Sequence, residues 1–246
     1  MSSPMRIAVV TGANKGVGLA IVRQMALQYP KSAFNNGPLL IYLTARDQGR
    51  GEAALKQIHE DAQLKQAKAL VSQGGLSTIK YKQLDISDKQ SIDKLADDLK
   101  TEHGQIDVLI NNAGIAMQGF DANIVKETLH CNYYGTLEAT ERILPLIRDG
   151  GRLVNVASMA GKLGKYSPEL RKRFLHASSP DDATQLMQEF ASSVEAGDHK
   201  EKGWISAGYA VSKAGVICMT KAIAAREHAR GSKVLINACC PGYVVT

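Results

Sequence analysis

Short apolar runs rich in β-branched residues alternate along this 246-residue chain with longer stretches whose apolar positions recur at helical spacing. The short runs predict strands at residues 6–10, 39–44, 78–84, 107–110, 152–156 and 234–238. The longer stretches predict helices at residues 17–29, 48–71, 88–103, 124–148 and 206–230. Buried strands that alternate with helices build a parallel sheet covered on both faces, so the pattern predicts a doubly wound, mostly parallel α/β fold.

Two segments interrupt this alternation. Residues 30–38 form a polar, turn-rich stretch, and residues 161–203 form a longer one with helix-like pieces at 167–176 and 180–195. No linker or repeat divides the chain, so we expect a single domain, 1–246, with an inserted helical segment at about 161–203. The insertion separates two candidate catalytic residues described below, which favours a wall beside the active site over a surface excursion.

The composition and charge narrow the class of protein. A hydrophobic content of 44% is ordinary for a water-soluble globular fold. No apolar run reaches the roughly 18 residues needed to cross a bilayer, and the first residues lack the layout of a signal peptide. We therefore expect a cytoplasmic protein with no membrane partner. The formal charge of +6 is spread along the chain without a recognition motif, which argues against nucleic-acid binding.

The cysteines show neither CxxC spacing nor an accompanying histidine cluster; they are Cys131, Cys218, Cys239 and Cys240. This pattern argues against a zinc site and against a disulfide framework. We therefore expect no metal.

The first chemical motif is the turn Thr11–Gly18, which follows a predicted strand and opens a predicted helix. Gly12 permits the tight turn, Gly16 lets the backbone approach a pyrophosphate, and Gly18 allows close packing of helix and sheet. The N–H groups at the start of the helix then face the phosphates. The motif therefore predicts a Rossmann-type site for a dinucleotide.

Charged residues after the second strand bear on the choice of nicotinamide cofactor. Arg46 and Lys15 could close on the 2′-phosphate of NADP from two sides, through charge-assisted hydrogen bonds. Asp47 could instead bind the free ribose hydroxyl of NAD if Arg46 pointed outward. Asp47 is also a suitable N-cap for the helix that begins at Gln48. We favour the capping role, and hence NADP(H).

A second motif, Tyr209-Ala-Val-Ser-Lys213, places a phenol and an ammonium at positions i and i+4 of a predicted helix, on one face. A tyrosine pKa of about 10 makes a reluctant base, and a nearby cation favours the phenolate. Lowering that pKa by about three units corresponds to roughly 4 kcal/mol, which is within reach of two close cations in a sheltered site, Lys213 and the oxidised nicotinamide. We expect Tyr209 to be the general acid and base, with its pKa lowered by Lys213.

Ser158 ends the fifth predicted strand, at the sheet edge where doubly wound folds bind ligands. Its hydroxyl would bind the substrate oxygen and stabilise charge that develops there. A serine that ends a strand is more often a cap or turn residue, but the presence of Tyr209 and Lys213 favours the catalytic role.

The order of these motifs resembles that of the short-chain dehydrogenase/reductases. The resemblance rests on the GxxxGxG spacing of the turn, Asn111-Asn-Ala-Gly114, Asn132, Ser158, Tyr209-xxx-Lys213 and Pro241-Gly242, and it covers essentially the whole chain. Within the family the chain is most similar to the monomeric NADPH-dependent carbonyl reductases. The resemblance implies reduction of aldehydes, ketones or quinones. It also implies a monomer, because the corresponding insertion covers a helical face that other members use to form tetramers.

The resemblance also assigns residues. Asp85 and Ile86 would lie at the adenine, Asn112 to Gly114 at the adenosine ribose, and Val244 and Thr246 at the nicotinamide carboxamide. The implied cofactor-binding set is Gly12, Asn14, Lys15, Gly16, Val17, Gly18, Arg46, Asp85, Ile86, Asn112, Ala113, Gly114, Tyr209, Lys213, Pro241, Gly242, Val244 and Thr246. The implied catalytic set is Asn132, Ser158, Tyr209 and Lys213.

Asn132 interrupts a predicted helix with a poor helix former. Such a residue usually faces solvent, but the family uses it to bend the helix and to hold a water linked to Lys213. The family also uses Lys213 to bind the nicotinamide ribose. The sequence stops at Thr246, where relatives continue into a segment that covers the substrate, and we expect such a segment in the native protein.

Three other residues near these motifs have two interpretations each. Cys240 could approach the nicotinamide or serve as small core packing, and we favour packing. Met159 and Trp204 could line the substrate pocket or pack in the core.

Two functions other than carbonyl reduction remain compatible with the motifs. One is a pathway-specific secondary-alcohol dehydrogenase of the same family, and the other is an NADP(H)-binding sensor without turnover. The complete Asn132, Ser158, Tyr209 and Lys213 set argues against the sensor, because a sensor has no need of proton transfer.

Overall fold

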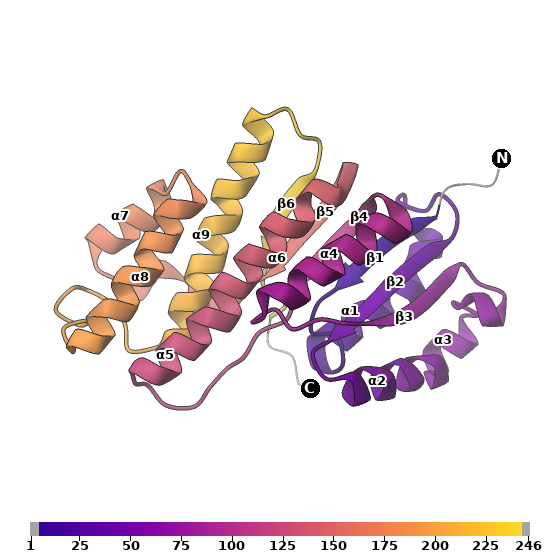
Figure 1. Cartoon of the computed structure of the whole chain (residues 1–246), viewed down its shortest axis with the longest axis horizontal. Coiled ribbons are helices and arrows are strands. Elements are labelled where there is room, and N and C mark those ends of the chain that lie inside the picture. Colours follow the sequence, from indigo (N-terminus) through magenta and orange to yellow (C-terminus); the bar gives the residue numbers. More distant parts are fainter. Residues whose placement is uncertain (1–4, 243–246) are drawn as a thin grey trace.

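A computed structural model describes residues 5–242 of the chain (Figure 1). Within these residues one six-stranded sheet has the order β3-β2-β1-β4-β5-β6, and every pair of neighbours is parallel. The strands are β1 (Arg6–Val10), β2 (Leu39–Ala45), β3 (Ser77–Gln83), β4 (Ile106–Asn111), β5 (Ile147–Val156) and β6 (Leu235–Cys239). The predicted doubly wound parallel fold is confirmed.

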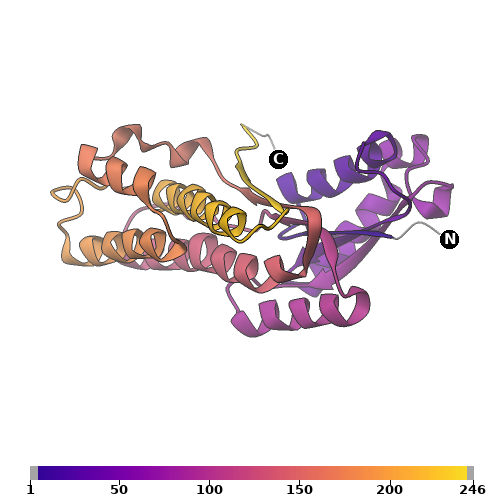
Figure 2. The ribbon, with the colours of Figure 1, turned by 90° about the horizontal axis from the view of Figure 1, so that it is seen from above.

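Helices cover both faces of the sheet because successive side chains of a strand point to opposite sides. Ile7 and Val9 of β1 share a core cluster with residues of α4 (Lys89–His103), α6 (Thr136–Ile143) and α9 (Gly208–Ala229). Ala8 and Val10 belong to a second cluster with residues of α1 (Gly16–Gln28), α2 (Gln48–Glu60) and α3 (Ala62–Gln66). Figure 2 shows α1 and α4 on opposite sides of the sheet.

The prediction of one helix at 48–71 is wrong for the second half of that range. Asp61 leaves the helical region with φ −59° and ψ 124°, and its carboxylate accepts hydrogen bonds from the backbone N–H groups of Gln63 and Leu64. Asp61 therefore ends α2 and caps the short α3 that follows. The chain then reaches a 3₁₀ turn at Val71–Gln73.

The helix predicted at 124–148 is also interrupted, and it ends early. A π-helical turn at His130–Gly135 separates α5 (Ala122–Leu129) from α6, and a 3₁₀ turn at Leu144–Leu146 follows. Because Pro145 in that turn has no N–H to continue the α-helical bonding, the helix gives way to β5. Arg148 therefore lies in a strand.

The segment predicted to be an insertion, residues 161–203, forms a helical layer at one end of the molecule. It contains α7 (Pro168–His176) and α8 (Pro180–Ala196), which lie beside α9 in Figures 1 and 2. Leu186 and Phe190 of α8 share a core cluster with residues of α5 and α9. Trp204 is 4% exposed and contacts Tyr166, Phe174 and Phe190, so it is a core residue of this layer. Within residues 5–242, none of the helices combines the length and apolar character of a membrane span.

Candidate active site

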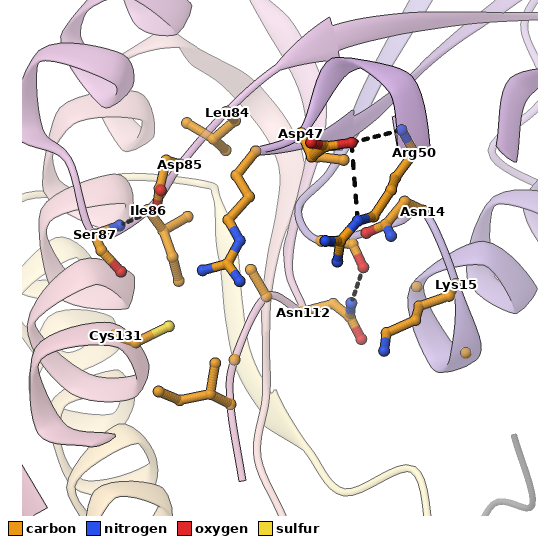
Figure 3. A pocket seen from close by; sticks show the side chains of 18 of the residues that line it. Asn14, Lys15, Asp47, Arg50, Leu84, Asp85, Ile86, Ser87, Asn112 and Cys131 are labelled. Atoms are coloured by element: carbon orange, nitrogen blue, oxygen red, sulfur yellow. Dashed lines mark hydrogen bonds and ion pairs between the residues drawn. The ribbon is translucent and has the colours of Figure 1, made fainter. Parts of the chain in front are cut away.

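A cavity of about 570 Å³ lies where the carboxyl ends of β1, β2 and β4 meet (Figure 3). Strand order reverses between β1 and β4, which is where doubly wound sheets bind nucleotides. Among the residues that line the cavity are these members of the predicted cofactor set: Gly12, Asn14, Lys15, Gly16, Val17, Gly18, Arg46, Asp85, Ile86, Asn112, Ala113 and Gly114. The tertiary structure thus brings most of that set to one place.

Hydrogen bonds join the glycine turn to the Asn-Asn-Ala-Gly segment. Thr11 Oγ1 accepts from the backbone N–H groups of Asn112 and Ala113, both at 2.9 Å. Asn112 Nδ2 donates to the Thr11 and Gly12 carbonyls at 2.9 and 3.0 Å. A Cβ on Gly18 would lie 2.5 Å from both Asn112 Nδ2 and the Gly12 oxygen. No side chain fits there, so a residue other than glycine would separate the two motifs.

The start of α1 is suited to an anion. Lys15 is its N-cap residue, in extended backbone, and no side chain caps the first turn. Gly12 and Gly16 have φ of +60° and +55°, which favour glycine. The N–H groups of that turn therefore have no side-chain acceptor and border the cavity, which fits the phosphates of a dinucleotide.

Cations line the cavity beside the end of β2. Asp47 Oδ1 accepts from the Arg50 N–H at 2.8 Å, so the predicted capping role of Asp47 is confirmed. Arg50 also lines the cavity, together with Arg46 and Lys15. In Figure 3 the Lys15 and Arg50 side chains enter from one side, opposite Asp85. Arg50 was not predicted from the sequence, although its place in the first turn of a helix at a strand end was an available signal.

The opposite wall comes from the segment after β3 and from the π-helical turn. Asp85 Oδ1 accepts from the Ser87 N–H at 2.9 Å, which fixes its carboxylate. Burial raises the pKa of the Cys131 thiol, which faces the cavity in Figure 3. The lining residues outside the predicted cofactor set are Ala45, Asp47, Arg50, Leu84, Ser87, Ile115, Ala116 and Cys131. Most are immediate neighbours of predicted residues.

Asn132 is completely buried, so it does not face solvent. It lies within the π-helical turn, where the hydrogen bonding departs from the α pattern. The bend and the bound water that the resemblance implies for Asn132 stay predictions. Its Oδ1 accepts from the Ile115 N–H at 2.7 Å, and its Nδ2 donates to the Ile115 carbonyl at 2.8 Å and to Ser212 Oγ at 3.1 Å. The Asn132 amide thus bonds α9 to the segment that follows Gly114.

Lys213 and Tyr209 share a face of α9. The Lys213 Nζ lies 5.8 Å from the centre of the Tyr209 ring and donates to the Val156 carbonyl at 2.8 Å. Burial lowers the pKa of Lys213 to about 8, because the charged form loses hydration. Tyr209 itself is half-buried. Neither residue lines the 570 Å³ cavity, although Lys213 lies near Gly114, which does.

Ser158 follows β5 and caps the 3₁₀ turn Met159–Gly161, with its Oγ accepting from the Ala160 N–H at 3.2 Å. This turn packs directly on α9, because a Cβ on Gly161 would lie 2.9 Å from the Lys213 carbonyl carbon. Ser158 therefore caps this turn and also lies beside α9. Met159 is 54% exposed, so it is not a core residue.

The end of the described chain contributes less to the cavity than the other predicted segments do. Pro241 and Gly242 are exposed and do not line the cavity, and the Gly242 N–H donates to Cys240 Sγ at 3.4 Å. Cys240 is only partly buried, so the expected core packing is wrong. It follows β6, a strand whose side chains are mostly exposed. Val244 and Thr246 lie outside the described residues.

The parallel sheet, the glycine turn and the cation-lined cavity define a dinucleotide-binding α/β protein. A family model described as short chain dehydrogenase matches residues 6–168, and the chain belongs to this family. It is 40% identical to carbonyl reductase (NADPH) 1 of Macaca fascicularis and 39% identical to that of Homo sapiens. Both alignments cover 100% of this chain and 84% of the relative.

A solved structure agrees with this assignment. The menthone neomenthol reductase of Mentha piperita superposes with a TM-score of 0.79 at 27% identity, over 97% of this chain and 90% of that one.

Proposed function

We propose that this chain is an NADPH-dependent carbonyl reductase that converts aldehydes, ketones or quinones to alcohols, with Tyr209 as the general acid. The relatives at about 40% identity over the full chain are named as NADPH carbonyl reductases, which supports both the reaction and the cofactor. The observation that carries the catalytic assignment is local. The Lys213 Nζ lies 5.8 Å from the centre of the Tyr209 ring. It also donates a hydrogen bond to the Val156 carbonyl, at the end of the strand that leads to Ser158.

The cavity residues support the choice of NADPH. The free N–H groups at the start of α1 would hold the pyrophosphate, and Asp85 with Ile86 would border the adenine. Lys15, Arg46 and Arg50 would hold the 2′-phosphate, because a phosphate dianion is best matched by several cations in a small volume. When bound, NADPH supplies the hydride for the carbonyl carbon.

The protein's own groups would supply the proton. The Tyr209 hydroxyl would donate to the carbonyl oxygen as negative charge develops there, and the Ser158 hydroxyl would hydrogen-bond the same oxygen. The Lys213 ammonium would stabilise the resulting phenolate across the short distance that separates the two side chains. Asn132 would hold Ile115, and with it the wall of the cavity, against α9.

The test is the loss of reduced-nicotinamide absorbance with a small quinone and with an activated aldehyde. We expect turnover with NADPH and a fall in kcat of about 10²- to 10⁴-fold in Tyr209→Phe, the usual contribution of a general acid. Cofactor binding by that variant should stay near the parent value. Absence of turnover in the parent, with Tyr209→Phe behaving identically, would instead support an NADP(H)-binding sensor.

We also propose a cytoplasmic monomer. The inserted layer supports this assembly state, because α8 buries apolar side chains against α5 and α9 that would otherwise be available to a partner subunit. Light scattering at micromolar concentration should give the mass of one chain, and a stable tetramer would contradict the proposal. Cell fractionation would test the compartment.

A further inference from the structure

Ser212 bonds two elements of the site through one oxygen. Its side chain is completely buried in α9, between Tyr209 and Lys213 in the sequence. The Oγ atom donates to the Tyr209 carbonyl at 2.8 Å and accepts from Asn132 Nδ2 at 3.1 Å. The turn of α9 that carries the proposed acid is therefore bonded to the Asn132 amide.

Asn132 extends this link to the wall of the cavity. Its amide makes a reciprocal pair of bonds with the backbone of Ile115, and Ile115 lines the cavity next to Gly114. An amide nitrogen has two protons to donate. In this site one proton goes to the Ile115 carbonyl and the other to Ser212. Loss of the Ser212 oxygen would leave a buried N–H without a partner, which is costly in a dry environment.

We propose that Ser212 is a positioning residue of the reductase. Its hydroxyl fixes the Asn132 amide and thereby holds the Gly114–Ile115 backbone in register with Tyr209 and Lys213. The effect on rate rests on the proposed function, whereas the effect on Ile115 does not. Because catalysis depends on the alignment of groups from separate elements, a loosened link lowers the rate of the chemical step.

The same helix contains a matched control. Thr220 is 2% exposed, donates to the Val216 carbonyl at 2.6 Å and accepts from Asn155 Nδ2 at 2.9 Å. Ser212 and Thr220 therefore perform the same local task, a back-bond to the helix and acceptance of a buried amide proton. The chain of bonds from Thr220 reaches Asn111, which does not line the cavity.

The experiment compares Ser212→Ala with Thr220→Ala in the full chain. Each variant should lose thermal stability, because each leaves a buried amide proton unpaired. Only Ser212→Ala should speed hydrogen–deuterium exchange at the Ile115 amide, whose acceptor is Asn132. Only Ser212→Ala should lower kcat, by about tenfold at saturating NADPH, a smaller loss than the roughly 10²-fold cost of a 1 Å misplacement. In an Asn132→Ala background, Ser212→Ala should change the exchange no further.

Equal protection of the Ile115 amide against hydrogen–deuterium exchange in Ser212→Ala and Thr220→Ala would overturn the proposal. A kcat of Ser212→Ala within about twofold of the Thr220→Ala value would also overturn it, given a parent that turns over. If the parent does not reduce the quinone, the proposed function fails. The exchange comparison then still decides whether Ser212 positions Ile115.

Discussion

The Lys213 ammonium donates a 2.8 Å hydrogen bond to the Val156 carbonyl while lying 5.8 Å from the centre of the Tyr209 ring. One side chain thus contacts the end of β5 and faces the proposed acid on α9. Its burial lowers its pKa to about 8, so the ammonium form persists at neutral pH but is easily lost above it. The protonation state of Lys213 therefore depends on how closely the surrounding residues pack around it.

Stability should rise with pH over the range in which only the unfolded chain protonates Lys213. The pKa is about 8 in the folded protein against 10.5 unfolded, so between these values the unfolded state binds more protons. The free energy of unfolding should increase relative to Lys213→Met by up to about 3 kcal/mol, at 1.36 kcal/mol per pKa unit. Urea titrations of both proteins from pH 7 to about 10 measure this difference. Parallel pH profiles would contradict the prediction.

Removal of Arg50 should weaken NADPH binding and spare NADH. Arg50 lines the cavity beside Arg46 and Lys15, and a hydrogen bond to a charged group contributes about 1.5–3 kcal/mol. We expect Arg50→Gln to raise the Kd for NADPH by roughly tenfold or more and to leave that for NADH within about twofold. Lys56→Gln is the control, because Lys56 is exposed on the same helix and does not line the cavity. Equal effects of the two variants would indicate a nonspecific loss of charge.

The variant Asp47→Ala distinguishes the two interpretations of the Asp47 carboxylate, as the N-cap of a helix or as a ligand of the NAD ribose. The structure makes Asp47 the N-cap of α2, so the variant should lose about 1 kcal/mol of stability. Because the change removes a negative charge near the cation-lined end of the cavity, the KM for NADPH should not rise. Thermal denaturation and steady-state kinetics measure the two effects. Unchanged stability, together with a specific loss of NADH turnover, would show that Asp47 binds a ribose instead.

Gly18→Ala should damage cofactor binding and stability together. The added Cβ would lie 2.5 Å from Asn112 Nδ2, and overpacking of this kind costs about 1–3 kcal/mol. We expect a lower melting temperature and a higher Kd for NADPH, measured by a titration that follows the fluorescence of the reduced cofactor. Gly164→Ala is the matched control, because a Cβ there meets no atom within 4 Å. Equal melting temperatures of the two variants would contradict the packing argument.

Much of the fold was predictable from the local pattern of apolar and polar residues. The six strands were predicted within a few residues of their bounds, except that β5 begins at Ile147. Gly150 and Gly151 interrupt the apolar pattern of β5, so its first half does not look like a strand in the sequence. The break at Asp61 was missed for a related reason. Aspartate is tolerated inside an amphipathic pattern, and only the bonds of its carboxylate show where one helix ends and another begins.

The sequence by itself determined which chemistry the chain carries, because spacing along a strand or helix fixes which groups share a face or an edge. The glycine turn, the Tyr209 and Lys213 pair and the parallel sheet all follow from such short-range rules. The tertiary structure alone decided the contacts between segments about 100 residues apart, such as Asn112 with the glycine turn. It also decided the joining of Ser212, Asn132 and Ile115. These contacts depend on how separate elements pack, and no periodicity within one element encodes the position of another.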